Sequence, residues 1–114
     1  MTFEMNSRIY TIKFVTQQQM YSESNEANDL KGNYFGKFLP YKQEIWLSKD
    51  LSYQQSLFTL VHELTHCYIW AFNTNMEQLI EEDICNINSN SFFIICEIIT
   101  KYINKRIWEK KHIC

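Results

Sequence analysis

Glycine and proline are almost absent from this chain, which has two glycines and one proline in 114 residues. Because these two residues make many tight turns and interrupt helices, their scarcity predicts few sharp turns and long helices. A hydrophobic run long enough to cross a bilayer is also missing. The longest apolar stretch, around residues 92–99, is broken by Glu97. We therefore expect no membrane-spanning segment and no membrane partner.

Paired cysteine motifs are missing as well, and we expect no secretory leader. The four cysteines form no C-x-x-C pair, and the first residues lack a basic region followed by an apolar run. This pattern predicts free thiols in a reducing, cytoplasmic setting. The formal net charge of −2 gives no general reason to expect nucleic acid or an anionic membrane as a partner.

What remains is the composition of a folded protein. Hydrophobic residues make up 46% of the chain and aromatic residues 16%, which argues against a disordered chain. A chain of 114 residues predicts one domain, residues 1–114, with a basic C-terminal tail at about 105–114. Nothing in the sequence indicates a particular oligomeric state.

Three segments have the patterns of strands. Residues 8–15 alternate and are rich in β-branched side chains, which predicts a strand whose Tyr10, Ile12 and Phe14 face the core. Residues 34–39 and 43–47 flank a short loop and predict a β-hairpin. The polar segment 17–29 between these strands predicts at most a short helix that crosses back over the sheet.

Two long helices are expected after the hairpin. Ser52 and Gln55 form a capping-box pattern, which predicts a helix over residues 53–73. A second helical pattern begins with an acidic turn at residue 77 and continues to about residue 104. We therefore predict an α+β fold in which a small, mostly antiparallel sheet packs on both helices.

The first of these helices contains the motif H-E-x-x-H. Residues four apart lie on the same face of a helix, so His62 and His66 can share one metal ion. Glu63 lies one position round, where its carboxylate can reach a water on that ion. Two imidazoles with a nearby carboxylate suit zinc. Both histidines lie away from the apolar stripe of the helix, so their position favours a site over a chance pairing.

A catalytic zinc usually has three protein ligands and one open position. The missing ligand should come from the next helix, where Glu81, Glu82 and Asp83 are the available carboxylates. These residues also compensate the helix dipole, which alone would account for an acidic first turn. From the residues alone, both explanations stay open.

The H-E-x-x-H motif followed by Glu82-x-x-Cys85-Asn86 resembles the gluzincin metallopeptidases. It is most similar to the small ImmA/IrrE-type and minimal gluzincins of phages and other mobile elements, and the resemblance covers roughly residues 8–98. In that family a glutamate completes the zinc site, and a residue one turn later orients a ligand histidine. Glu81 could take the place of Glu82 if the helix had a different register.

The resemblance implies a complete set of site residues for a bound Zn²⁺. The metal ligands would be His62, His66 and Glu82, the general base Glu63, and the supporting residue Asn86.

The function that the resemblance implies is zinc-dependent hydrolysis of peptide bonds in a specific protein substrate, such as a regulator or repressor. In many metallopeptidases the strand before the metal helix is a sheet edge that pairs with extended substrate, and residues 44–47 would have that role here.

Two alternatives remain. In one, the chain is a non-catalytic zinc scaffold that binds a host or phage protein, although a purely structural site would not need Glu63. In the other, the basic tail binds nucleic acid. A basic helix end is more often a solvated surface, so the sequence disfavours this partner.

Overall fold

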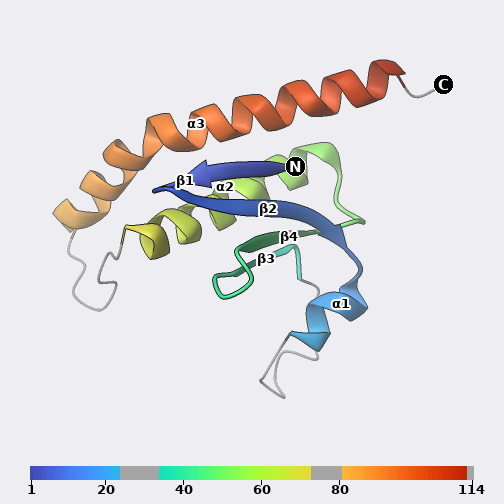
Figure 1. The fold of residues 1–114 in the computed structure, drawn as a ribbon, viewed down its shortest axis with the longest axis horizontal. Coiled ribbons are helices and arrows are strands. Elements are labelled where there is room, and N and C mark those ends of the chain that lie inside the picture. The colour runs from blue at the N-terminus through green and yellow to red at the C-terminus, as the bar shows by residue number, and fades with distance from the viewer. Residues whose placement is uncertain (24–33, 73–80, 113–114) are drawn as a thin grey trace.

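The structure, a computed structural model, describes residues 1–23, 34–72 and 81–112, and for residues 81–86 and 112 it describes the backbone only. Its elements in chain order are β1 (Thr2–Met5), β2 (Arg8–Val15), α1 (Gln17–Ser22), β3 (Gly36–Leu39), β4 (Glu44–Ser48), α2 (Tyr53–Ala71) and α3 (Glu81–His112). They form a small α+β fold, as the sequence predicts (Figure 1). None of the helices in the described part is long and apolar enough to cross a membrane.

The four strands form one open, mixed sheet in the order β1-β2-β4-β3. The β1–β2 and β3–β4 pairs are antiparallel, and the hairpin predicted from residues 34–47 is present. However, β4 also pairs with β2 in parallel. The prediction that residues 44–47 form a sheet edge is therefore wrong. Because β4 has a neighbour on each side, the edge on this side of the sheet is β3.

The core lies between one face of the sheet and the two long helices. Tyr10 and Ile12 on β2 are buried there, as predicted, together with Leu60 and Leu64 of α2. Phe14 is an exception, because it is 37% exposed. Its ring lies at the end of β2, with the Arg106 guanidinium 5.4 Å from the ring centroid.

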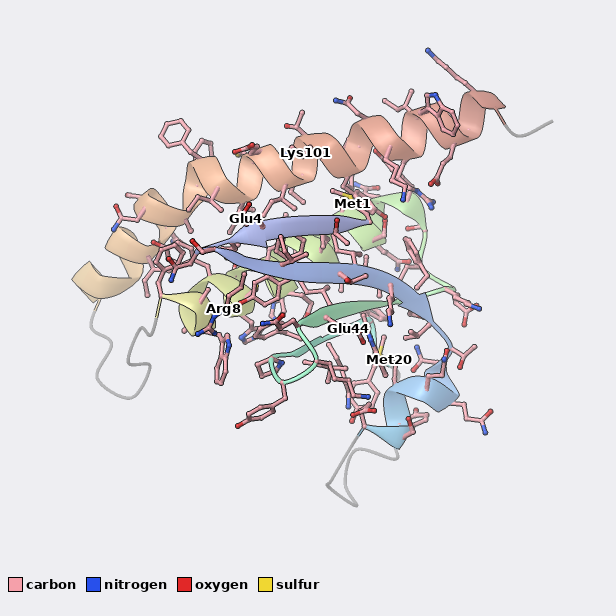
Figure 2. The ribbon with its side chains drawn as sticks, viewed as in Figure 1. Met1, Glu4, Arg8, Met20, Glu44 and Lys101 are labelled. Carbon is pink, nitrogen blue, oxygen red and sulfur yellow. The ribbon has the colours of Figure 1, made fainter. Side chains whose placement is uncertain are left out.

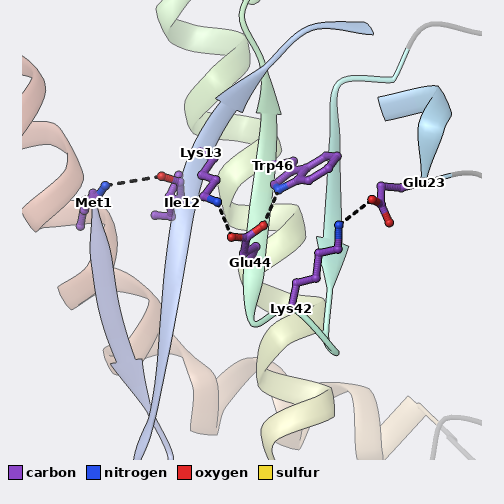
Figure 3. Close-up of polar contacts among 7 residues, drawn as sticks. All are labelled: Met1, Ile12, Lys13, Glu23, Lys42, Glu44 and Trp46. Atoms are coloured by element: carbon purple, nitrogen blue, oxygen red, sulfur yellow. Dashed lines mark hydrogen bonds and ion pairs between the residues drawn. The ribbon is translucent and has the colours of Figure 1, made fainter. Parts of the chain in front are cut away.

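The opposite face of the sheet carries charged side chains. Lys13 and Trp46 both bind Glu44, through an ion pair and an indole N–H hydrogen bond of 3.0 Å (Figure 3). Lys42 forms an ion pair with Glu23 at 2.6 Å. Such partly exposed pairs contribute little to stability, and here they mark the solvent side of the sheet.

The helix α1 covers one end of that solvent face. It starts with a capping box between Thr16 and Gln19. Met20 is fully buried against Val15 and Trp46 (Figure 2). The short helix predicted over residues 17–29 is thus present to Ser22, and the rest of that prediction falls outside the described residues.

The helix α2 begins where its capping box predicts. Ser52 accepts a hydrogen bond from the backbone N–H of Gln55, and the Gln55 side chain accepts one from the backbone N–H of Ser52. These two bonds satisfy amide groups that would otherwise lack helical partners.

The helix α3 continues to His112, beyond the predicted end near residue 104. Residues 105–112 are therefore helical and not a tail. Tyr102 is buried against α2, where its hydroxyl lies 3.2 Å from the Ser56 hydroxyl. The predicted start of the helix, at residue 77, lies outside the described residues.

Candidate metal centre

The two motif histidines lie one turn apart on α2 and face solvent together. The ring centroids of His62 and His66 are 4.9 Å apart, with an angle of 73° between the ring planes. Both side chains are exposed. The helix therefore presents two imidazoles on one accessible face, as their spacing predicts.

Glu63, between them in sequence, is buried. Glu63 is only 5% exposed, and its Oε2 atom has no hydrogen-bond partner among the described residues. One ligand atom from each of His62, Glu63 and His66 lies within 4.8 Å of the other two. A buried carboxylate oxygen without a partner is costly unless a proton or a cation satisfies it. These three residues could hold a metal ion.

The pKa shifts at this cluster fit a cation site. Burial raises the pKa of Glu63, although the neighbouring His62 acts in the opposite direction. Although the His66 side chain is exposed, partial desolvation against the helix, together with the charge of His62, lowers its pKa. A lowered pKa favours the uncharged imidazole, which is the form that binds metal. A cation would also stabilise the ionised carboxylate of Glu63.

Close packing of β3 on α2 explains why Glu63 is buried while the histidines are not. A β-carbon added to Gly36 would lie 2.7 Å from Thr59 Cγ2, 3.0 Å from the Trp46 carbonyl oxygen and 3.2 Å from Glu63 Cγ. Only glycine permits this approach of strand to helix. The first residue of β3 therefore covers the stem of Glu63.

A pocket of about 330 Å³ opens beside the carboxylate. Besides His62 and Glu63, it is lined by Tyr34, Phe35, Gly36, Phe58 and Thr59. Two residues of the motif thus line a space that a ligand can enter.

The structure brings together three of the five predicted site residues: His62, Glu63 and His66. Glu82 and Asn86 lie near the start of α3, and their side chains are outside the described residues. Their roles stay predictions.

Two further residues bear on the site. Gly36 was missed, although a glycine inside a strand is itself a signal of close backbone approach. Cys67, one position after His66, is fully buried. Burial raises the pKa of its thiol to about 12, which keeps it protonated and unsuited to bind metal.

Comparisons with protein families, with curated proteins and with solved structures found no match to this chain. The functional interpretation therefore depends on the residues of the site and their geometry.

Proposed function

We propose that the protein is a zinc-dependent peptidase that cleaves a specific protein substrate, in the manner of the gluzincins that its motif resembles. One observation carries the proposal: a buried carboxylate with an unpaired oxygen lies beside two exposed imidazoles. Structural zinc sites are closed by four protein ligands, whereas catalytic sites keep a position open. The accessible histidines and the adjoining pocket fit the second kind.

The donor set favours zinc over magnesium and calcium. Imidazole nitrogens suit zinc, whereas magnesium and calcium prefer oxygen ligands. In the proposed site His62 and His66 each contribute one ring nitrogen, and Glu82 contributes the third ligand from α3. Asn86, one turn after Glu82, would orient one of the ligand imidazoles.

Glu63 is the proposed general base and acid. When bound, zinc supplies a Lewis acid that polarises the substrate carbonyl and makes water more acidic. In this role the Glu63 carboxylate would accept a proton from the attacking water and then deliver it to the leaving amine. The burial that raises its pKa helps it to do both, because a base that must also act as an acid works best with a pKa nearer the operating pH.

The substrate would lie along β3, the sheet edge next to the candidate metal centre. Among the described strands, β3 pairs with β4 alone, so one of its edges has no strand partner. An extended peptide can add to such an edge through backbone hydrogen bonds. Gly36 would then bring the peptide backbone next to Glu63.

The direct test is cleavage of a pool of unfolded peptides, prepared from the proteins of the native host, by the purified, zinc-loaded protein. We expect cleavage by the wild type and a loss of about 10²–10⁴-fold in rate for Glu63→Gln, the usual contribution of a general base. A chelator should stop cleavage, and added zinc should restore it. Undiminished cleavage by Glu63→Gln would overturn the proposal, as would a zinc-loaded wild type that cleaves nothing.

A further inference from the structure

Two exposed phenylalanines lie beside the candidate metal centre. Phe35 is 51% exposed and Phe58 is 77% exposed, and both line the pocket that contains Glu63. Phe58 precedes His62 by four residues on α2, so its ring stands on the helix face of the histidines, one turn before them. Single exposed apolar side chains are ordinary, but apolar surface that is concentrated at a pocket marks a binding site.

The rest of the pocket is also lined largely by uncharged groups. Tyr34 and Thr59 line it further, and Gly36 contributes only backbone. Apart from His62 and Glu63, the side chains that line it are aromatic or, at Thr59, a small hydroxyl. Its volume of about 330 Å³ lies at the small end of the range of ligand pockets, about 300–1,000 Å³. A pocket of this size and lining suits one bulky apolar side chain.

We propose that the pocket between Phe35 and Phe58 selects substrates with a bulky apolar residue, of the phenylalanine or leucine type, next to the bond that is cleaved. This inference rests on the proposed peptidase function. The pocket shares His62 and Glu63 with the candidate metal centre, so a side chain seated there brings its own peptide group to the catalytic carboxylate.

The physical basis of the selection is the burial of apolar surface on both the pocket and the substrate side chain. A large apolar side chain would cover the two exposed rings and lose its own contact with water. A charged side chain would lose hydration when it is buried against the aromatic rings, which is unfavourable. A glycine would leave the rings exposed.

Two small zinc-binding probes test the pocket without any peptide cleavage. Phenylalanine hydroxamate and glycine hydroxamate share the group that binds zinc and differ in the side chain. Calorimetry on the zinc-loaded protein should show that the phenylalanine compound binds about tenfold or more tightly, since differences of 10–200-fold are typical of apolar pockets. In Phe58→Ser this ratio should fall to within about threefold.

A matched control is Phe93→Ser. Phe93 is 79% exposed on α3 and does not line the pocket, so its replacement should keep the wild-type ratio. Equal affinities of the two probes in the wild type would overturn the proposal. A ratio that survives both Phe58→Ser and Phe35→Ser would overturn it too.

The same experiment separates the pocket from the peptidase function. If the apolar probe is preferred but no peptide is cleaved, the apolar selectivity of the pocket is supported and the peptidase function is contradicted. If peptides are cleaved with no apolar residue enriched beside the cleaved bond, the peptidase function is supported and the selection of apolar residues by the pocket is contradicted.

Discussion

Gly36 on β3 and Glu63 on α2 lie so close that a β-carbon on the glycine would be 3.2 Å from Glu63 Cγ. The strand thus shields the stem of the carboxylate from water at the point where the sheet ends. His62 and His66, on the open side of the same helix, stay accessible. Packing between two elements distant in sequence therefore contributes to the burial of Glu63.

Gly36→Ala should destabilise the protein by about 1–3 kcal/mol, the usual cost of overpacking. The added methyl group would meet Thr59 Cγ2 at 2.7 Å and the Trp46 carbonyl at 3.0 Å, and the carbonyl belongs to the backbone of a central strand. The strand β3 must therefore shift away from α2. Urea unfolding measures the change in the free energy of unfolding.

Thr59→Ser provides the control for this prediction, because it removes the methyl group that the new side chain would meet. In the Thr59→Ser background, Gly36→Ala should be less destabilising than in the wild type. An equal loss of stability in both backgrounds would show that this contact is not the cause.

The metal-free protein should gain stability from Glu63→Gln at neutral pH. Burial raises the pKa of Glu63 above its ordinary value of 4.5, so the folded protein holds this proton more tightly than the unfolded chain does. The stabilising contribution is therefore present below about pH 4.5 and is lost as the pH rises through the folded-state pKa. Glutamine cannot ionise, so the stability of the variant does not decrease in this way as the pH rises. The variant should therefore be more stable than the wild type at pH 7, by about 1 kcal/mol or more.

Urea unfolding at pH 4 and pH 7, with a chelator present, measures this effect. Glu97→Gln is a suitable control, because Glu97 is an exposed carboxylate on α3 that forms an i,i+4 ion pair with Lys101. Its replacement should leave the pH dependence of stability nearly unchanged. Identical pH profiles for wild type and Glu63→Gln would contradict the burial argument.

His66→Ala should abolish stoichiometric zinc binding. We expect about one zinc per folded chain in the wild type, because two imidazoles and one neighbouring carboxylate lie close enough to hold a single ion. Metal analysis after gel filtration measures the ratio. His112→Ala, which removes the third histidine at the far end of α3, should keep the metal. Full zinc occupancy in His66→Ala would disprove the site.

The elements that the sequence predicts well depend on local signals. The capping box of Ser52 and Gln55 determines where α2 begins, and the alternation of residues 8–15 determines β2. The grouping of His62, Glu63 and His66 is local as well, because the pitch of a helix brings them together.

The errors concern relations between distant segments. The strand β4 is central because it pairs in parallel with β2, a pairing that its own residues do not specify. A signal was nevertheless present: three consecutive apolar residues, Ile45, Trp46 and Leu47, are all buried, as is typical of a strand covered on both faces. The strand β1 was not predicted from the sequence, because its four residues are too few to show a clear alternation of apolar and polar side chains.

The C-terminal helix was predicted too short because its charges resemble those of a solvated tail. Its last turns are supported by the buried Tyr102 and by i,i+4 ion pairs such as Lys105 with Glu109. The contact between Gly36 and Glu63 could not be read from the helix motif, since it depends on where β3 lies against α2.

Glu82→Gln should weaken zinc binding more than Glu81→Gln does. Of the two glutamates, Glu82 alone has Asn86 four residues later, in the position that the resemblance assigns to the residue supporting the site. Loss of a carboxylate ligand should reduce the affinity, whereas loss of a neighbouring surface charge should change it little. Competition with a chromophoric chelator measures both affinities. The reverse order would mean that α3 presents Glu81 to the metal instead.

Glu63→Gln also distinguishes a peptidase from a protein that acts only by binding a partner. The substitution preserves the shape of the side chain and, in the proposed site, leaves the ligands His62, His66 and Glu82 unchanged. We expect the variant to keep its zinc and its circular dichroism spectrum and to lose the biological effect of the protein, because the group that moves the proton is gone. For a non-catalytic zinc scaffold the same variant should act as the wild type does, while His66→Ala, which removes the metal, should fail. The measurement needs only a phenotype on expression in the native host and a metal analysis of the purified variant. Full biological activity in a zinc-loaded Glu63→Gln protein would therefore rule out catalysis as the basis of the effect and favour the scaffold.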